Sequence, residues 1–176
     1  MIIREVNADQ DASQILQIYA PYVLNTCITY EYTVPSLGEF KNRILKISSK
    51  HAYFVAEVNG IIVGYAYATQ FRERTAYDWT LESAIYVQET HHAKREDQAS
   101  IASLLYEALF QKLKAKGIKQ VIGVISLPND KSVRFHEKMG FEKIGIFQSV
   151  GFKHDQWHDA LFMTKFLEAR PLTAPK

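Results

Sequence analysis

A hairpin signal at Asn59-Gly60 limits the folds open to this chain more than any other feature. Runs rich in β-branched and aromatic residues flank it at 52–58 and 61–70. Asn-Gly is the dipeptide preferred in two-residue β-turns, so the pattern predicts two antiparallel strands joined by a tight turn. A sheet therefore lies at the centre of the fold, and the other elements pack against it.

Helical and strand patterns lie on both sides of this hairpin. Ser36 followed by Glu39 is a capping box that opens a helix, and Gly117 is placed to end a longer one. The other predicted elements are a strand at 2–6, a helix at 11–25, a strand at 79–87, a helix at 99–116, a strand at 119–127, a helix from Asn129 to Gly140, and strands at 141–148 and 158–166. This order predicts an α/β domain, with a mixed sheet and helices on both faces.

Length, charge and cysteine content narrow the class of protein. The 176 residues suit one core, with 1–168 expected as the domain and 169–176 as a disordered tail. The net charge of +2, without a basic stripe, argues against a nucleic-acid partner. No apolar run is long enough to span a bilayer, and no signal-peptide pattern is present. Cys27 is the only cysteine, which favours a reducing compartment, so a cytoplasmic protein is expected.

Two polar patterns allow a functional and a structural interpretation. Glu82 interrupts an apolar strand pattern, where a carboxylate is either a functional base or a partnered, outward-facing residue. His154 and His158 are four residues apart, but a two-histidine zinc site requires that spacing on a helix. Because Gly151 indicates a loop that leads into a strand, no metal site is predicted.

Three segments, in this order and spacing, resemble the phosphinothricin acetyltransferases and their methionine sulfone or sulfoximine acetyltransferase relatives in the GNAT superfamily. They are 72–83 (RERTAYDWTLES), 127–141 (LPNDKSVRFHEKMGF) and 151–159 (GFKHDQWHD). The resemblance implies a single GNAT-like domain with a mixed, mostly antiparallel sheet. It further implies an acetyl-CoA-dependent N-acetyltransferase, commonly homodimeric, that acts on the amino group of a small amino-acid-like acceptor.

The resemblance assigns two catalytic candidates. Glu82 matches the glutamate used as general base, which would accept the amine proton during direct transfer in a ternary complex. His136 matches a histidine of this branch and is a candidate acid or helper base. The structural alternative for His136 is a helix histidine packed against Phe135 and Phe141.

The resemblance also implies binding residues. The acceptor pocket is expected at Arg72, Arg74 and Tyr77, where two guanidinium groups suit a carboxylate and a second anionic group, with Tyr30 as an aromatic wall. A charged surface loop is the alternative for these arginines. Acetyl-CoA contacts are expected at the backbone of Ile85, Tyr86 and Val87, at Asn129 and Ser132, and along the phosphate-loop window at Gln98, Ala99, Ser100, Ile101, Ala102 and Ser103.

That phosphate-loop window departs from the superfamily pattern. Asp97 replaces the leading basic or amide residue, and Ser100 replaces the first glycine. Three readings stay open at this point: an altered but working loop, a helix that begins near 92–95, and a non-enzymatic binding module that has lost tight coenzyme binding.

Overall fold

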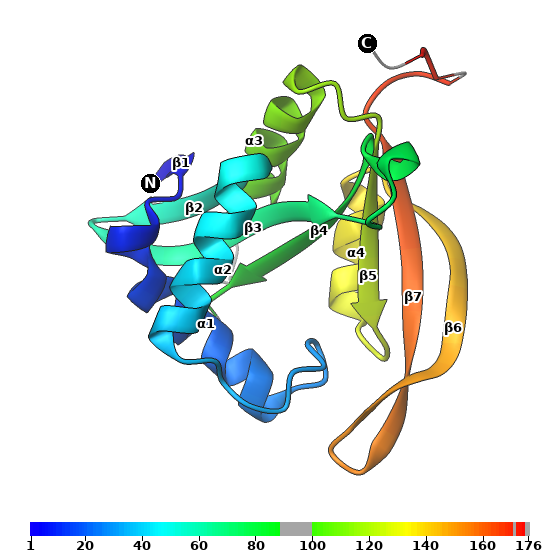
Figure 1. Ribbon diagram of the computed structural model, residues 1–176. Coiled ribbons are helices and arrows are strands. Elements are labelled where there is room, and N and C mark those ends of the chain that lie inside the picture. Colours follow the sequence, from blue (N-terminus) through cyan, green and yellow to red (C-terminus); the bar gives the residue numbers. More distant parts are fainter. Residues whose placement is uncertain (89–99, 171, 175–176) are drawn as a thin grey trace.

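The fold is known from a computed structural model that describes residues 1–88, 100–170 and 172–174 (Figure 1). The strands are β1 (Ile2–Glu5), β2 (Tyr53–Val58), β3 (Ile61–Gln70), β4 (Thr80–Val87), β5 (Gln120–Ser126), β6 (Glu142–Lys153) and β7 (Gln156–Phe166). The helices are α1 (Ala8–Asn25), α2 (Leu37–Lys50), α3 (Ile101–Ala115) and α4 (Asp130–Lys138), with a short 3-10 turn, η1 (Thr75–Tyr77).

One seven-stranded sheet joins all the described strands in the order β1-β2-β3-β4-β5-β7-β6. Only β4 and β5 pair in parallel, and every other neighbouring pair is antiparallel. The prediction of a mixed, mostly antiparallel sheet is confirmed. The hairpin predicted at Asn59-Gly60 is also present, with positive φ at both residues, as a type I′ turn requires.

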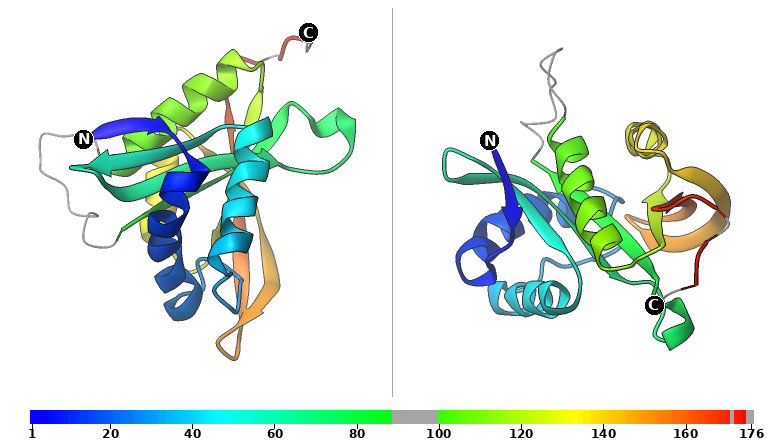
Figure 2. Two further views of the ribbon diagram at one scale, coloured as in Figure 1. Left: turned by 60° about the vertical axis from the view of Figure 1, so that its left-hand side comes forward. Right: turned by 90° about the horizontal axis from the view of Figure 1, so that it is seen from above.

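Helices cover both faces of the sheet, as the sequence predicted (Figure 2). On one face α1 and α2 enclose a core that includes Ile15, Ile44 and Tyr65. On the other face α3 and α4 pack against a second core that includes Leu105 and Leu81. The central strand β3 therefore buries side chains on both sides, which explains why its pattern is largely apolar and not alternating.

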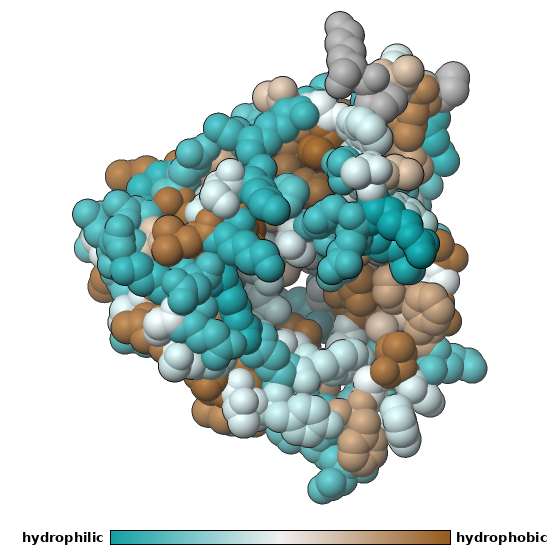
Figure 3. All heavy atoms as spheres, viewed as in Figure 1, coloured by the Kyte–Doolittle hydropathy of each residue, from teal (hydrophilic) through white to brown (hydrophobic). Residues whose placement is uncertain are grey.

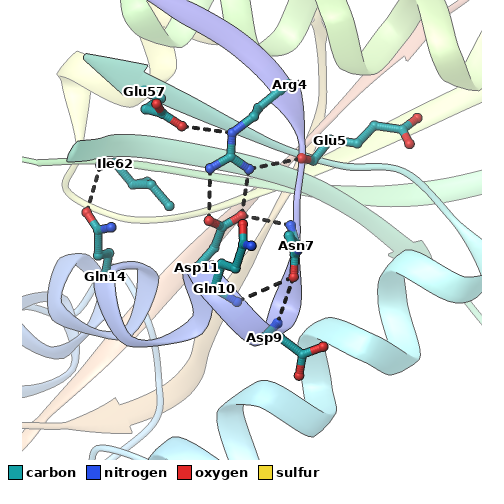
Figure 4. A network of polar contacts seen from close by, with 9 residues as sticks. All are labelled: Arg4, Glu5, Asn7, Asp9, Gln10, Asp11, Gln14, Glu57 and Ile62. Atoms are coloured by element: carbon teal, nitrogen blue, oxygen red, sulfur yellow. Dashed lines mark hydrogen bonds and ion pairs between the residues drawn. The ribbon is translucent and has the colours of Figure 1, made fainter. Parts of the chain in front are cut away.

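Helix α1 begins at Ala8, three residues before the position predicted from apolar spacing. The Asn7 side chain caps it by accepting hydrogen bonds from the backbone N–H groups of Asp9 and Gln10 (Figure 4). Arg4 binds both carboxylate oxygens of Asp11, at 2.7 and 2.9 Å. Burial works to raise the pKa of Asp11, but the hydrogen bonds from Arg4 and from the Asn7 N–H outweigh it and lower that pKa. The first turn was missed because its polar residues pair with residues outside the helix, Asp11 with Arg4 and Asp9 with Lys41.

The last two strands are longer than predicted and form a hairpin. β6 continues to Lys153 and β7 begins at Gln156, where strands near 141–148 and 158–166 were expected. His154 and Asp155 form the turn, with φ of 51° and 58°. The segment expected to be a loop is therefore strand, because two residues in the left-handed region are enough to reverse the chain.

Candidate active site

Strands β4 and β5 separate part of the way along the sheet. They pair only from Thr80 to Ser83 on β4 and from Gln120 to Gly123 on β5. Beyond Ser83, β4 continues beside β3 alone, while β5 stays paired with β7. Figure 1 shows the two strands diverging, and Figure 3 shows the surface hollowed near the same place. At this opening, beyond Ser83, the edge of β4 that would face β5 has no strand partner among the described residues, so a ligand can pair with it.

Glu82 lies on β4 immediately before the strands separate. It pairs with Thr69 on β3 and with Ile122 on β5. Because alternate residues of a strand share a face, Glu82 lies on the same face as Tyr86, which packs with α1 and α2. Burial raises the pKa of the Glu82 carboxyl, and no described residue donates a hydrogen bond to it. Such a carboxylate is poised to take a proton.

His136 lies on α4 and is only 4% exposed. Its Nδ1–H donates to the Ser132 carbonyl oxygen at 2.8 Å, so in the neutral ring Nε2 accepts from the Tyr106 hydroxyl at 3.0 Å. Burial lowers the pKa of His136 and so favours that neutral form. Gly123 makes room for the ring, because a Cβ there would lie 3.1 Å from its Cδ2 atom. The ring also packs against Phe135 and Phe141, as the structural alternative expected.

The two catalytic candidates lie on opposite faces of the sheet. The Tyr106 hydroxyl that binds His136 also lies 3.2 Å from the Ser83 hydroxyl. Ser83 follows Glu82 directly in β4, so their side chains point to opposite faces. The structure therefore brings both candidates to the start of the opening, but it does not bring them into contact.

The residues predicted to contact acetyl-CoA border the same opening. Ile85, Tyr86 and Val87 lie in the part of β4, from Ala84 to Val87, that has no β5 partner. The Asn129 side chain caps α4 by accepting from the Ser132 N–H at 3.2 Å, so the capping role expected for it is present.

At α3 the helix begins at Ile101, two residues later than predicted. Ser100 is the N-cap, and its hydroxyl accepts from the Ser103 N–H at 3.2 Å. The N–H groups of Ile101 and Ala102 belong to the first turn, where helix N–H groups have no intrahelical partner, and no other described residue accepts from them. Gln98 and Ala99 lie outside the described residues, as do the segment near 92–95 and Asp97.

The predicted acceptor residues fall into two places. Arg72, Arg74 and Tyr77 are exposed on the connection between β3 and β4. The Arg72 guanidinium carbon lies 5.1 Å from the centre of the Phe71 ring and 6.0 Å from that of Tyr77. Tyr30 lies elsewhere, between α1 and α2, where its ring stacks on His158 of β7. The structure joins Arg72 to Tyr77 but gives no contact between Tyr30 and the arginines.

A cluster of tyrosines on the Glu82 face was not predicted. A cavity of about 50 Å³ lies between α1, α2 and the sheet, and among the residues that line it are Tyr19, Tyr65, Tyr67, Glu31 and Arg43. Burial raises the pKa of Tyr67, and the nearby carboxylates of Glu82 and Glu31 raise it further. The cavity therefore belongs to the same side of the sheet as the candidate base. Tyrosines two residues apart in β3 were the available sequence signal.

Neither the described histidines nor the described helices indicate a metal or membrane site. His154 is exposed in the β6–β7 turn, whereas His158 is buried and donates from Nε2 to the Lys153 carbonyl oxygen at 3.0 Å. Within residues 1–88, 100–170 and 172–174, no three metal-binding side chains gather. In the same ranges no helix is both long and apolar enough to cross a bilayer.

Comparison with known proteins gives consistent matches over nearly the whole chain. A family model described as an acetyltransferase (GNAT) domain matches residues 3–162. A phosphinothricin N-acetyltransferase from Streptomyces viridochromogenes is 34% identical over 158 residues, which cover 90% of this chain and 84% of that protein. An L-methionine sulfoximine/L-methionine sulfone acetyltransferase from Salmonella typhimurium is 27% identical, and the match covers 87% of each chain.

A solved structure shows the same arrangement of elements. It is a GNAT superfamily phosphinothricin acetyltransferase from Sinorhizobium meliloti in complex with acetyl-CoA. It superposes on this chain with a TM-score of 0.89 at 34% identity, and the match covers 99% of this chain and 92% of that one.

Proposed function

The chain belongs to the GNAT acetyltransferase family, and we propose that it acetylates the amino group of a small amino-acid-like acceptor, of the phosphinothricin or methionine sulfoximine type. Membership makes it an acyltransferase with acetyl-CoA as its acetyl donor, as the sequence predicted. We assign residues 1–168 to the catalytic domain and 169–176 to a tail.

The observation that carries the proposal is the opening between β4 and β5 with one candidate catalytic residue on each face. Glu82 faces the side covered by α1 and α2, and His136 faces the side covered by α3 and α4. An acceptor on the Glu82 face and a thioester held from the other face can meet in the opening. This arrangement favours direct transfer in a ternary complex, without an acetylated enzyme.

Glu82 is assigned the role of general base. The amine of an amino acid is mostly protonated near neutral pH, and only the free amine can attack. Glu82 takes one proton from the ammonium, the amine nitrogen bonds to the thioester carbonyl carbon, and the carbon–sulfur bond breaks to release the coenzyme thiolate. The second proton of the nitrogen then leaves as the amide forms and is taken up by the thiolate, which gives the free thiol. The raised pKa of Glu82 suits it to hold the proton during the step.

The residues around the opening fit a pantetheine arm and a pyrophosphate. On its β5 side, the backbone from Ile85 to Val87 has no strand partner among the described residues, so it can pair with amide groups of the arm and donate to the developing oxyanion. Asn129 and Ser132 are assigned to the coenzyme side, together with the free N–H groups at the start of α3. The described start of α3, from Ser100, has N–H groups that can bind a phosphate, which favours the enzyme over a non-enzymatic binding module.

His136 is assigned to the donor side and not to the amine. Its ring is neutral and bonded to Tyr106, whose hydroxyl reaches Ser83 at the point where the strands separate. From this position, His136 assists the departure of the coenzyme thiolate. It does not assist Glu82 in removing the proton from the amine.

The acceptor is assigned to Arg72, Arg74, Tyr77 and Tyr30. The first three are exposed on the connection that leads into β4, which begins two residues before Glu82. A guanidinium pair at this place suits the carboxylate of an amino acid. Tyr30 approaches from the α1–α2 connection.

The proposed assembly is a homodimer formed through β6. This edge strand exposes apolar side chains, among them Ile144, Ile146, Phe147 and Val150. An exposed apolar edge of this kind marks an interaction surface. We place the enzyme in the cytoplasm, because its one cysteine, Cys27, is free.

The test is a coenzyme A release assay with acetyl-CoA and a panel that includes phosphinothricin, methionine sulfoximine and methionine sulfone. We expect saturable release with at least one of these acceptors and initial-rate lines that intersect. Absence of release with the whole panel would contradict the acceptor class. Parallel lines, together with an acetylated protein detected by mass spectrometry, would contradict direct transfer.

A further inference from the structure

Lys153 is a fully buried lysine at the end of β6. Its side chain is only 2% exposed. The ammonium donates to the carbonyl oxygen of Val23 at 2.7 Å and to that of Thr29 at 2.8 Å. No carboxylate in the part of the chain that the structure describes forms an ion pair with it. Among the described residues, its hydrogen-bond partners are therefore two backbone carbonyls.

These carbonyls explain why a charge is tolerated there. Val23 lies in the last turn of α1, where carbonyl groups lack helical partners and the helix dipole favours a cation. That turn contains no basic residue of its own. Burial lowers the pKa of Lys153, while Cys27 and Glu31 nearby act to raise it. Lys153 thus caps α1 from a strand far away in the sequence.

Two tyrosines tie the same loop to the same hairpin. The Tyr30 hydroxyl donates to the Asp159 carbonyl oxygen at 3.4 Å, and its ring lies directly over Gly151. The Tyr32 hydroxyl donates to the carbonyl oxygen of Phe152. We call Lys153, Tyr30 and Tyr32 the clasp, because they join the loop at 26–32 to the β6–β7 hairpin.

The clasp acts on the side of the sheet that carries Glu82. The loop at 26–32 connects to α1 and α2, which cover that face (Figure 1). Its Thr29 hydroxyl bonds to Tyr19 at 2.8 Å, and its Glu31 carboxylate bonds to Arg43. Tyr19, Glu31 and Arg43 line the cavity next to Tyr67. A shift of the loop would therefore move a wall of the space that an acceptor must enter.

We propose that Lys153 is a positioning residue for acceptor binding: by fixing the loop at 26–32 against the β6–β7 hairpin, it holds Tyr30 in place as a wall of the acceptor site. The proposal rests on the proposed acetyltransferase function. Lys153 itself touches neither substrate. Its effect should therefore fall on acceptor affinity and leave the coenzyme side unchanged.

The test compares Lys153→Met with Lys165→Met. Both lysines lie on the same hairpin, but Lys165 is at its other end, near Phe110 and Gly140. We expect Lys153→Met to raise the acceptor KM about tenfold, equivalent to about 1.4 kcal/mol, with the acetyl-CoA KM nearly unchanged. Lys165→Met should leave both values as in the wild type.

Gly151→Ala tests the clasp without altering Lys153. A Cβ at this position would lie 2.5 Å from the Tyr30 ring, so the ring must shift. We expect a rise in the acceptor KM without a change in the acetyl-CoA KM. If Lys153→Met does not fold, Gly151→Ala alone tests whether the clasp positions Tyr30 for acceptor binding. A wild type without activity would count against the proposed function. An active wild type whose Lys153→Met and Gly151→Ala variants change neither KM, or change both KM values equally, would overturn the role of the clasp.

Discussion

Glu82 and His136 lie on opposite faces of the central sheet, each beside the point where β4 and β5 separate. Glu82 pairs with Ile122, and the His136 ring lies against Gly123, the next residue of β5. Glu82, on the acceptor side, and His136, on the donor side, thus contact neighbouring residues of β5. Substitutions at the two positions should affect different steps of the reaction.

Glu82→Gln should lower kcat by about 10²–10⁴-fold, the usual contribution of a general base. The amide keeps the shape of the carboxyl but cannot take the amine proton. Acetyl-CoA affinity, measured by calorimetry, should stay nearly unchanged because the coenzyme groups lie on the other face. Glu107→Gln, an exposed substitution on α3, is the control and should retain full activity. Wild-type kcat in Glu82→Gln would remove Glu82 from the mechanism.

The pH dependence of kcat/KM in the wild type should reflect the raised pKa of Glu82. The base works only when ionised, so kcat/KM should rise with pH through a value above the ordinary glutamate pKa. Because the folded pKa is raised, this group stabilises the fold fully below its unfolded pKa, and that contribution is lost as pH rises through the folded pKa.

Thermal melts then give a second measurement of the same shift. Between these two pKa values the wild type should lose stability with rising pH relative to Glu82→Gln, which cannot ionise. Equal pH profiles for the two proteins would show that Glu82 is not desolvated.

The order of elements could be predicted because each carries a local pattern. Asn59-Gly60 specifies a turn, and Ser36 caps α2 with a bond to the Glu39 N–H at 3.2 Å. Their signals lie within a few residues of the structure they specify. The early start of α1 was missed, because Asp11 is buried through Arg4, a residue outside the helix.

The arrangement of the site depends on distant contacts, which a single sequence does not contain. Alternation along β4 shows that Glu82 and Ser83 face opposite ways, but not which helix covers each face. The sequence around Lys153 does not indicate that this side chain is buried, because a lysine before a turn is usually exposed. Its burial follows from contacts with Val23 and Thr29, more than a hundred residues earlier in the chain.

Tyr106→Phe should lower kcat with little change in the acceptor KM. The substitution removes the hydroxyl that donates to His136 Nε2 and leaves the ring in the core. A proton route on the donor side would lose its link to Ser83, and the coenzyme thiolate would leave more slowly. Tyr22→Phe is not a suitable control, because Tyr22 binds the Val87 carbonyl oxygen beside the opening. Tyr32→Phe, on the acceptor side, should show the opposite pattern, with an altered acceptor KM.

Arg72→Ala and Arg74→Ala should each raise the KM for an amino-acid acceptor more than that for acetyl-CoA. Both arginines are exposed and lie on the short connection before β4. Arg72 also covers Phe71 and Tyr77, so its loss should have the larger effect. Lys131→Ala, an exposed cation on α4, is the matched control. Equal changes in both KM values, or no change in either, would show that the arginines are surface charges without a role in acceptor binding.

Ile146→Lys should convert a dimer into a monomer. Ile146 is 54% exposed on β6, whose outer edge has no partner among the described strands. A lysine there would place a charge where a second copy must bury apolar surface. Ile61→Lys is the control, because Ile61 is an equally exposed isoleucine, 58%, at the start of β3. Light scattering after size-exclusion chromatography should give the mass of two 20.2 kDa chains for the wild type and Ile61→Lys, and of one chain for Ile146→Lys. A monomeric wild type, or dissociation by Ile61→Lys alone, would exclude β6 as the dimer surface.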